Sequence, residues 1–262
     1  LNQPDQSSHA ILAPGGKIIV VGSTFNGTDT DTAIARYNAD GSLDTTFNAT
    51  GFRPGTDVLD VSPLGDHAHA VATLADGTIV LAGFAGASAF YTGNSNLMLM
   101  RYNTDGSLEV AEHDLEFSEV GRSIAVQPDG KVLVAGFIYG GLGNVQFAVA
   151  RMDSATGNLD TTFGNGAGYV LSDFAAGQGG VASSVAVDSL GRILVSGTSA
   201  DLNFVIFRLE SDGTPDTGFG QGSTLGGSVT HVVGDAATVM DSSVEVFDAE
   251  LDQNDDYGGA TL

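Results

Sequence analysis

The chain has 262 residues, of which 42% are hydrophobic and 16% charged, and 32 acidic against 9 basic residues give a formal net charge of −23. This length and apolar fraction suit one large all-β domain with a core, whereas the negative charge excludes nucleic-acid binding through Lys and Arg. The chain has no cysteine and no apolar run long enough for a membrane-spanning helix, which excludes thiolate sites, disulfides and helical membrane insertion. It begins at Leu1 without a visible signal peptide, so we expect it to come from a longer parent chain.

Four segments of the chain resemble one another at a spacing of about 50 to 65 residues, and such self-similarity is typical of repeat architectures. In chain order, each unit opens with a short apolar segment that predicts a strand, at residues 10–12, 71–73, 124–126 and 185–187. A glycine turn follows. A nearly continuous apolar strand then ends in Gly, at residues 17–22, 78–83, 131–136 and 192–197, as expected for a strand buried on both faces.

The third strand of each unit ends at an arginine, and these are Arg36, Arg101, Arg151 and Arg208. A polar loop follows, and a weaker outer strand, such as residues 168–172, completes the unit. Four antiparallel strands per unit are typical of a propeller blade. We therefore predict an all-β, β-propeller-like array of four four-stranded antiparallel blades over residues 1–222, as a complete or partial ring. A β-sandwich is the alternative, but near-identical repeats favour radial stacking.

The third unit contains Asp-Gly-Lys-Val-Leu-Val-Ala-Gly at residues 129–136, Ala-Val-Ala-Arg at 148–151 and Leu-Asp-Thr-Thr-Phe-Gly at 159–164. This pattern closely resembles the bacterial delta-60 β-propeller repeat, and the resemblance covers roughly residues 8 to 222. The second unit departs from it, because residues 109–112 read Glu-Val-Ala-Glu in place of Asp-Thr-Thr-Phe, which leaves its outer strand unsupported by the pattern. The resemblance implies a module of a very large secreted or surface protein, and it carries no catalytic residues.

The last part of the chain has a different pattern. Residues 234–241, 244–252 and 257–262 resemble the opening of a cadherin-like module of giant bacterial adhesins, so we expect residues 223–262 to be the truncated start of such a β-sandwich and to form a short β segment. Asp248, Glu250 and Asp252 offer alternate carboxylates, an arrangement that suits Ca²⁺. Chance clustering in an acidic chain is the competing explanation.

The clearest recurring polar constellation pairs each repeat arginine with an acid eight or nine residues later. The pairs are Arg36 with Asp44, Arg101 with Glu109, Arg151 with Asp160, and Arg208 with Asp216. We interpret them as ion pairs that hold a turn together, and a ring of anion-binding arginines is the alternative. Phe47, Phe163 and Phe219 also recur, and we expect them to fill the space between blades rather than to stack on a sugar.

A possible channel mouth is formed by one position of the innermost strand, which holds Ser8, His69, Arg122 and Ser183. This set is polar but has no carboxylate. His67 and His69 share one face of a strand, which a metal site could use, with Asp66 the nearest acid. Two histidines alone are a weak signal, so we interpret them as surface or channel-mouth residues. For the core, we expect buried side chains at Ile19, Val71, Val80, Ile124, Leu133, Val185 and Leu194.

Together, these resemblances imply a non-catalytic propeller module of a large secreted or cell-surface bacterial protein, used for adhesion, interaction or spacing. The expected partners are another protein, a surface glycan and further domains of the parent chain, without nucleic acid, and the expected cofactor is none or Ca²⁺. The alternative is a propeller enzyme, of the polysaccharide lyase, glycosidase or lactonase type, that acts at the central channel.

Overall fold

The computed structural model describes residues 5–87, 95–104, 107–115, 118–139, 145–172, 179–200, 203–219 and 228–231. These residues form four four-stranded antiparallel sheets and two short 3-10 turns, at Pro14–Gly16 and Gly164–Gly166. The predicted all-β array of four four-stranded units is confirmed. Within the described ranges, no helix is both long and apolar enough to cross a membrane.

The sheets follow one another along the chain, and in each the strands are paired in chain order. The first sheet consists of β1 (Gln6–Ala13), β2 (Lys17–Phe25), β3 (Thr30–Tyr37) and β4 (Thr56–Leu59). The second consists of β5 (Gly65–Thr73), β6 (Ile79–Ala87), β7 (Asn96–Tyr102) and β8 (Leu108–His113). The third consists of β9 (Ser118–Val126), β10 (Val132–Tyr139), β11 (Val145–Met152) and β12 (Tyr169–Ser172). The fourth consists of β13 (Gly180–Val187), β14 (Ile193–Ser199), β15 (Phe204–Leu209) and β16 (Ser228–His231).

Two outer strands differ in position from the pattern of the sequence. In the second sheet, β8 begins directly after a shorter loop, and Glu109 pairs with Arg101 inside the β7–β8 ladder, so this unit has an outer strand without the Asp-Thr-Thr-Phe turn. In the fourth sheet, β16 pairs with β15 and lies after residue 222. Residues 232–262, which include the cadherin-like motifs, are outside the described residues.

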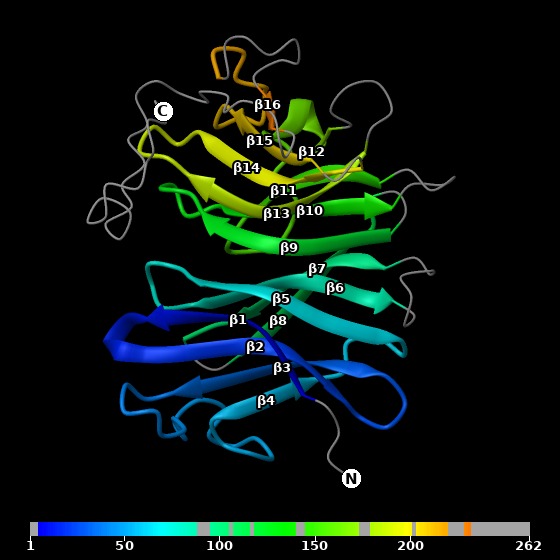
Figure 1. Cartoon of the computed structure of the whole chain (residues 1–262). Coiled ribbons are helices and arrows are strands. Elements are labelled where there is room, and N and C mark those ends of the chain that lie inside the picture. Colours follow the sequence, from blue (N-terminus) through cyan, green and yellow to red (C-terminus); the bar gives the residue numbers. More distant parts are fainter. Residues whose placement is uncertain are drawn as a thin grey trace, which may run out of the picture.

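The sheets stack face to face in chain order, with the first and the fourth at opposite ends of the stack (Figure 1). The first strand of each sheet lies on the inside, because β1 contacts β5, β5 contacts β9, and β9 contacts β13. Substantial contacts between sheets join only neighbours along the chain among the described strands. The propeller ring is therefore open between its first and fourth sheets.

Alternation within the apolar strands explains why both faces of the middle sheets are apolar. In β6, Ile79 and Leu81 pack in a cluster with the first sheet, while Val80 and Ala82 pack in a cluster with the third. In β10, Leu133 and Ala135 reach the fourth sheet in the same way. Successive side chains of a strand point to opposite faces, so one strand serves two interfaces.

The predicted core is buried at five of its seven positions: Ile19, Val71, Val80, Leu133 and Val185. Ile124 and Leu194 are half-buried instead. Ile124 packs against the cluster between the second and third sheets from β9, an inner edge strand. Leu194 points away from the third sheet, toward the face of the last sheet that no other described sheet covers, and an end sheet can bury only one of its faces.

A β-bulge interrupts each inner strand at the same place, opposite the glycine that ends the apolar motif of the second strand. These glycines are Gly22, Gly83, Gly136 and Gly197. A Cβ on them would lie 1.8 Å from the carbonyl oxygen of Gln6, His67 or Val120, or 2.1 Å from that of Val181. The recurring glycine is thus required because the bulged backbone approaches it closely.

Candidate functional site

The four residues expected at the channel mouth are the extra residues of the four bulges. The pairing register skips Ser8, His69, Arg122 and Ser183 in β1, β5, β9 and β13. A bulge leaves its extra residue outside the ladder and redirects its side chain. The structure therefore brings these four positions to the inner edge of the array, where Ser8, Arg122 and Ser183 are exposed and His69 is half-buried.

A histidine pair forms the centre of this edge between the first and second sheets. The rings of His67 and His69 stack with centroids 4.3 Å apart, and Phe84 lies 5.6 Å from His69. The hydroxyl of Ser8 lies 2.7 Å from Nε2 of His67 across the sheet boundary. Burial lowers the pKa of His67, and burial with the nearby charges of His67 and Arg122 lowers the pKa of His69 to about 3, so both rings are neutral at physiological pH.

Asp66 does not join the two histidines in a metal site. Its fully buried carboxylate accepts hydrogen bonds from the backbone N–H groups of Val61, Ser62 and Gly86, so it fixes the loop before β5. Burial raises the pKa of Asp66. Among the described residues, no group of three or more His, Asp or Glu side chains is placed to hold a metal ion, and the calcium candidates Asp248, Glu250 and Asp252 lie outside those residues.

Two hydrogen bonds at the inner edge join neighbouring sheets and were not predicted from the sequence. The residue directly after the bulge accepts a hydrogen bond from a backbone N–H of the next inner strand. Nδ1 of His9 accepts from Val71 over 3.1 Å, and Oγ of Ser123 accepts from Val185 over 3.1 Å. These N–H groups point out of an edge strand and would otherwise lack a protein partner. The shared repeat position of His9 and Ser123 was the available signal.

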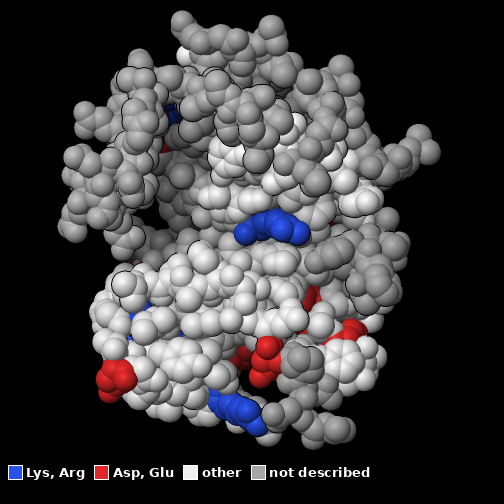
Figure 2. Space-filling model, viewed as in Figure 1, with Lys and Arg blue, Asp and Glu red and all other residues white. Residues whose placement is uncertain are grey.

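Arg122 is the exposed cation of the inner edge. Its guanidinium lies over the ring of Phe137 at 5.3 Å from the ring centroid. Figure 2 shows a basic patch in the middle of the viewed face surrounded by uncharged residues, with acidic side chains in the lower half of the view. Arg122 therefore combines charge with free hydrogen-bond donors on an otherwise apolar and hydroxyl-bearing edge.

The structure brings all four predicted Arg–acid pairs into contact. Arg36 lies 2.7 Å from Asp44, Arg101 2.9 Å from Glu109, Arg151 2.8 Å from Asp160 and Arg208 2.7 Å from Asp216. Three of the acids are largely buried, whereas the side chain of Glu109 is 54% exposed. The second pair differs because Glu109 sits in a strand rather than in a turn.

A second cation belongs to three of these pairs and was missed in the sequence. Lys17 lies 3.0 Å from Asp44, Lys131 2.5 Å from Asp160 and Arg192 3.8 Å from Asp216. All three cations occupy the first position of the apolar motif, which was the signal. Hydrogen bonds from Thr46, Lys17 and Arg36 hold the pKa of Asp44 below its usual range. Burial raises the pKa values of Asp160 and Asp216, but their contacts with Lys131 and Arg208 outweigh it, so both pKa values are also lowered.

The repeat arginines also connect one sheet to the next. Arg101 donates to the carbonyl of Ala155 in the third sheet's loop, and Arg151 donates to that of Ser211 in the fourth. In the three units that have a repeat phenylalanine, the arginine lies over its ring. The guanidinium carbon is 4.9 Å from the ring centroid for Arg36 and Phe47, 4.7 Å for Arg151 and Phe163, and 4.6 Å for Arg208 and Phe219. Each repeat arginine already has an acid partner within the protein, which argues against a ring of anion sites.

Phe47 and Phe163 fill the space between sheets, whereas Phe219 belongs to the last described sheet, where it is buried under Arg208. Phe47 packs on Tyr102 of the second sheet with centroids 5.3 Å apart. Phe163 is fully buried, and its ring lies so close to Gly213 that a Cβ there would approach it to 2.7 Å. Both rings thus seal an interface and are not available to stack on a sugar.

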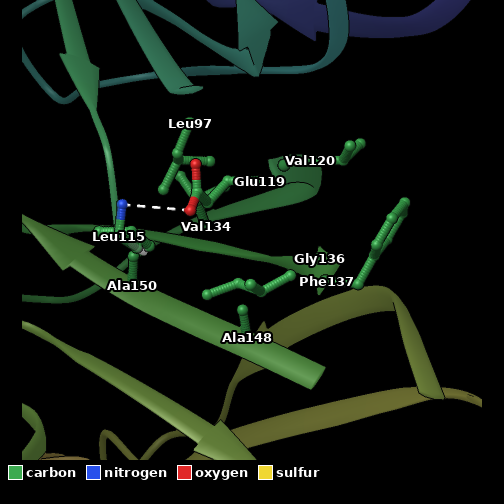
Figure 3. Close-up of a pocket in the computed structure, with 11 residues that line it drawn as sticks. Leu97, Leu115, Glu119, Val120, Val134, Gly136, Phe137, Ala148 and Ala150 are labelled. Carbon is green, nitrogen blue, oxygen red and sulfur yellow. Dashed lines mark hydrogen bonds between the residues drawn. The ribbon is translucent and has the colours of Figure 1, made fainter. Parts of the chain in front are cut away.

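A small cavity lies between the second and third sheets, and Glu119 of β9 points into it (Figure 3). The backbone N–H of Leu115 donates to the buried Glu119 carboxylate over 3.2 Å, and the other lining residues are mostly apolar, such as Leu97 and Val134. Its volume of about 10 Å³ is close to the space of one water molecule. This cavity is too small for an organic ligand.

The four described inner strands themselves contain no accessible acid. In β1, β5, β9 and β13, the carboxylates are those of Asp66 and Glu119, and both are buried and bonded to loop backbone. Enzymes that cleave glycosidic bonds commonly need two carboxyl groups beside the substrate. The geometry of the inner edge can bind hydroxyl, carbonyl or anionic groups through Ser8, Arg122 and Ser183.

Comparison with protein families finds one match. A model described as "Domain of unknown function (DUF5122) beta-propeller" matches residues 14–47, 74–110, 127–163 and 191–219, slightly more than half of the chain. These segments contain the apolar motif and the Arg–acid loop of each unit. No curated protein matches the chain.

Two solved structures resemble the chain distantly. A fucose lectin from Kordia zhangzhouensis in complex with methyl-fucoside aligns at 11% identity and a TM-score of 0.33, covering 55% of this chain and 93% of the lectin. Sqt1 from Chaetomium thermophilum aligns at 10% identity and a TM-score of 0.40, covering 82% of this chain and 61% of Sqt1. TM-scores this low give no basis for inferring function from either structure.

Proposed function

The chain belongs to the DUF5122 β-propeller family, and on this basis we propose that it is a non-catalytic interaction and spacer module of a larger secreted or cell-surface bacterial protein. The observation that carries the proposal is the use of the repeat's polar groups. Seven of the nine Lys and Arg side chains are engaged in ion pairs within the repeats. A module whose recurring polar residues hold sheets together suits a structural task.

Interaction with a partner is assigned to the inner edge. Ser8, Arg122 and Ser183 are exposed there and lie at equivalent positions of the first, third and fourth inner strands. Hydroxyls and a guanidinium over an aromatic ring suit the hydroxyl and carboxylate groups of a surface glycan or of a protein loop. Calcium and the cadherin-like continuation of the parent chain remain part of this proposal.

Location and activity test the proposal together. An antibody raised against this chain should label intact bacterial cells or detect the parent protein in the medium, without permeabilisation. The purified chain should release no product from a panel of polysaccharides and lactones. Labelling restricted to permeabilised cells would contradict the location, and turnover would contradict the non-catalytic role.

A hydrolase is the second candidate, favoured by the short contact between Ser8 and His67. A serine nucleophile needs a neutral base within hydrogen-bond reach, and these two side chains meet that requirement at 2.7 Å. A triad also needs a group that orients the base, and the described residues provide no hydrogen bond to the other ring nitrogen of His67. If the panel shows lactone or ester turnover, Ser8→Ala and His67→Ala should each abolish it. Ser184→Ala, at an exposed serine of β13 outside the bulge, is the matched control.

A further inference from the structure

The inner edge between the second and third sheets holds polar groups that the propeller itself does not use. We propose that Arg122, the backbone N–H of Ile124 and the ring of His69 form a binding site there for a sugar acid, which is a sugar with one carboxylate group. The inference rests on the proposed function, because it names the kind of partner that the inner edge binds. The site lies in the middle of the array, so it does not depend on what adjoins the first or the fourth sheet.

A hydrogen bond that joins inner strands elsewhere in the array is missing at this boundary. Between the first and second sheets, His9 accepts from the N–H of Val71, and between the third and fourth, Ser123 accepts from that of Val185. Ala70 holds the position of His9 and Ser123 in the second sheet. Its methyl side chain has no acceptor atom, so the bond to the third sheet cannot form.

The N–H group that Ala70 leaves open is that of Ile124. This residue holds the same place in the β9–β10 ladder as Val71 and Val185 hold in theirs. Its N–H therefore points away from β10 and toward β5, just as the other two point toward the preceding inner strand. A backbone N–H at such an edge needs an acceptor, and a ligand oxygen can supply it.

Arg122 and His69 approach this boundary from opposite sheets and rest on one apolar cluster. Phe84 of the second sheet packs there with Val120 and Phe137 of the third. The ring of His69 lies 5.6 Å from that of Phe84, and the guanidinium of Arg122 lies 5.3 Å from the ring centroid of Phe137. The shared cluster thus holds the two polar side chains on either side of the same boundary.

The histidine contributes a polar atom that the protein leaves unused. Nε2 of His69 is buried and has no hydrogen-bond partner among the described residues. Burial lowers the pKa of His69, and the charges of His67 and Arg122 add to this effect, so the ring is neutral and lies within electrostatic reach of Arg122. A buried polar atom without a partner costs free energy. A ligand hydroxyl beside the ring recovers that free energy after a small rotation of the side chain.

Arg122 determines the charge of the ligand. It is the one Lys or Arg in the four described inner strands, and its side chain is exposed. The acids of these strands, Asp66 and Glu119, are buried and bonded to loop backbone. A guanidinium can bind a carboxylate through two parallel hydrogen bonds, so a carboxylate is the group that suits this cation.

The surroundings of Arg122 favour a sugar over an acidic polypeptide. Ser8 and Ser183 hold the same bulge position in the first and fourth inner strands, so hydroxyl groups accompany the single cation. The whole chain has a formal net charge of −23, and such a field repels partners with many negative charges. A sugar with one carboxylate and several hydroxyl groups matches both features.

Nuclear magnetic resonance of the purified full chain tests the site, with D-glucuronate as the probe and D-glucose as its neutral counterpart. Glucuronate should shift the amide signal of Ile124 and the side-chain Nε signal of Arg122, and it should bind at least about tenfold more tightly than glucose. Arg122→Gln should remove this preference. Arg53→Gln removes the same charge from another exposed arginine, so it is the matched control and should bind glucuronate as the native chain does.

Ala70→Ser tests the open N–H group separately. A serine at this position should accept from Ile124 as Ser123 accepts from Val185, so we expect weaker glucuronate binding with an unchanged urea midpoint of unfolding. Tighter binding by Ala70→Ser would contradict the role of that N–H group.

Three results overturn the proposal. The first is equal affinity for glucuronate and glucose, or no shift at Ile124 and Arg122 with either sugar. The second is an equal loss of binding in Arg122→Gln and Arg53→Gln, which indicates general attraction to the protein's charges. The third is preference for a hexaglutamate peptide over glucuronate, which identifies an acidic protein segment as the partner. Binding by the purified chain is measured apart from cell labelling, so failure of this site is distinguished from failure of the proposed location.

Discussion

At the scale of single residues, the recurring polar side chains act as connectors between strands and sheets. The third unit is the most complete example: Arg151 bonds Asp160 and Thr162, reaches the carbonyl of Ser211 and covers Phe163. Charged groups with several partners at low exposure are costly to separate, because the remaining charge stays buried. Stability should therefore depend strongly on these clusters.

A double-mutant cycle on Arg151 and Asp160 measures this coupling. The two side chains are 7% and 10% exposed, so we expect a coupling free energy above about 1 kcal/mol, the upper end of the range for exposed pairs. Unfolding in urea gives the four free energies for Arg151→Met, Asp160→Asn, the double variant and the native chain. The Arg101–Glu109 pair is the control, and its cycle should give less than about 1 kcal/mol because Glu109 is exposed. Equal coupling free energies in the two cycles would contradict the conclusion that burial strengthens the Arg151–Asp160 ion pair.

The pH dependence of stability follows from the same acids. The pKa values of Asp44, Asp160 and Asp216 are lowered from 3.8 in the folded chain, so their contribution is fully present above that value. It is lost as the pH falls from about 4 toward the lower folded values, because the folded chain then takes up the protons that the unfolded chain already holds. Urea midpoints measured at pH 5, 4 and 3 should fall most steeply in the last interval.

The variant Asp160→Asn isolates one of these acids. Its loss of stability between pH 5 and pH 3 should be smaller than that of the native chain, because one depressed carboxyl no longer titrates. Parallel curves for the two proteins would show that this aspartate has an ordinary pKa in the folded state.

At the scale of elements, the inner strand and its partner are fitted to each other by a bulge and a glycine. Gly136→Ala would place its Cβ 1.8 Å from the carbonyl oxygen of Val120, and backbone on both sides would have to move. Overpacking of this kind costs about 1 to 3 kcal/mol, which thermal or urea unfolding can measure. Ser183→Ala, which alters a bulge side chain but no backbone, should stay within about 0.5 kcal/mol of the native chain. A neutral Gly136→Ala would remove the explanation for the recurring glycine.

Leu133 and Leu194 provide a matched pair at one repeat position. Leu133 is fully buried between two sheets, while Leu194 is half-buried on the open face of the fourth. We expect Leu133→Ala to cost about 2 to 5 kcal/mol and Leu194→Ala clearly less, as measured by urea unfolding. Equal costs would mean that another element covers Leu194.

Much of this arrangement could be predicted from the sequence, because the repeat imposes it four times. The strand order, the Arg–acid contacts and the inner-edge position of Ser8, His69, Arg122 and Ser183 follow from repeat spacing alone. Other contacts could not be predicted in this way, because their distances depend on how the strands twist and stack. Examples are Lys17 with Asp44 inside the first unit and His9 with Val71 between two sheets. The half-burial of Leu194 was also missed, because a repeat pattern does not show which unit lies at an end.

At the scale of the whole molecule, the chain is an open stack in which each sheet is held by its neighbours along the sequence. Such arrays distribute stability over their interfaces, so damage at one interface should remain local. Phe163 seals the interface between the third and fourth sheets, and Phe47 occupies the equivalent place between the first and second.

Hydrogen exchange read by mass spectrometry on Phe163→Ala tests this organisation most directly. Removing a buried phenylalanine costs about 3 to 5 kcal/mol, and we expect protection to fall in β11 and in β13 to β15 while β1 to β3 exchange as in the native chain. Phe47→Ala should give the mirror image, with losses in the first and second sheets. A uniform loss of protection over all four sheets in either variant would contradict the open, neighbour-held stack.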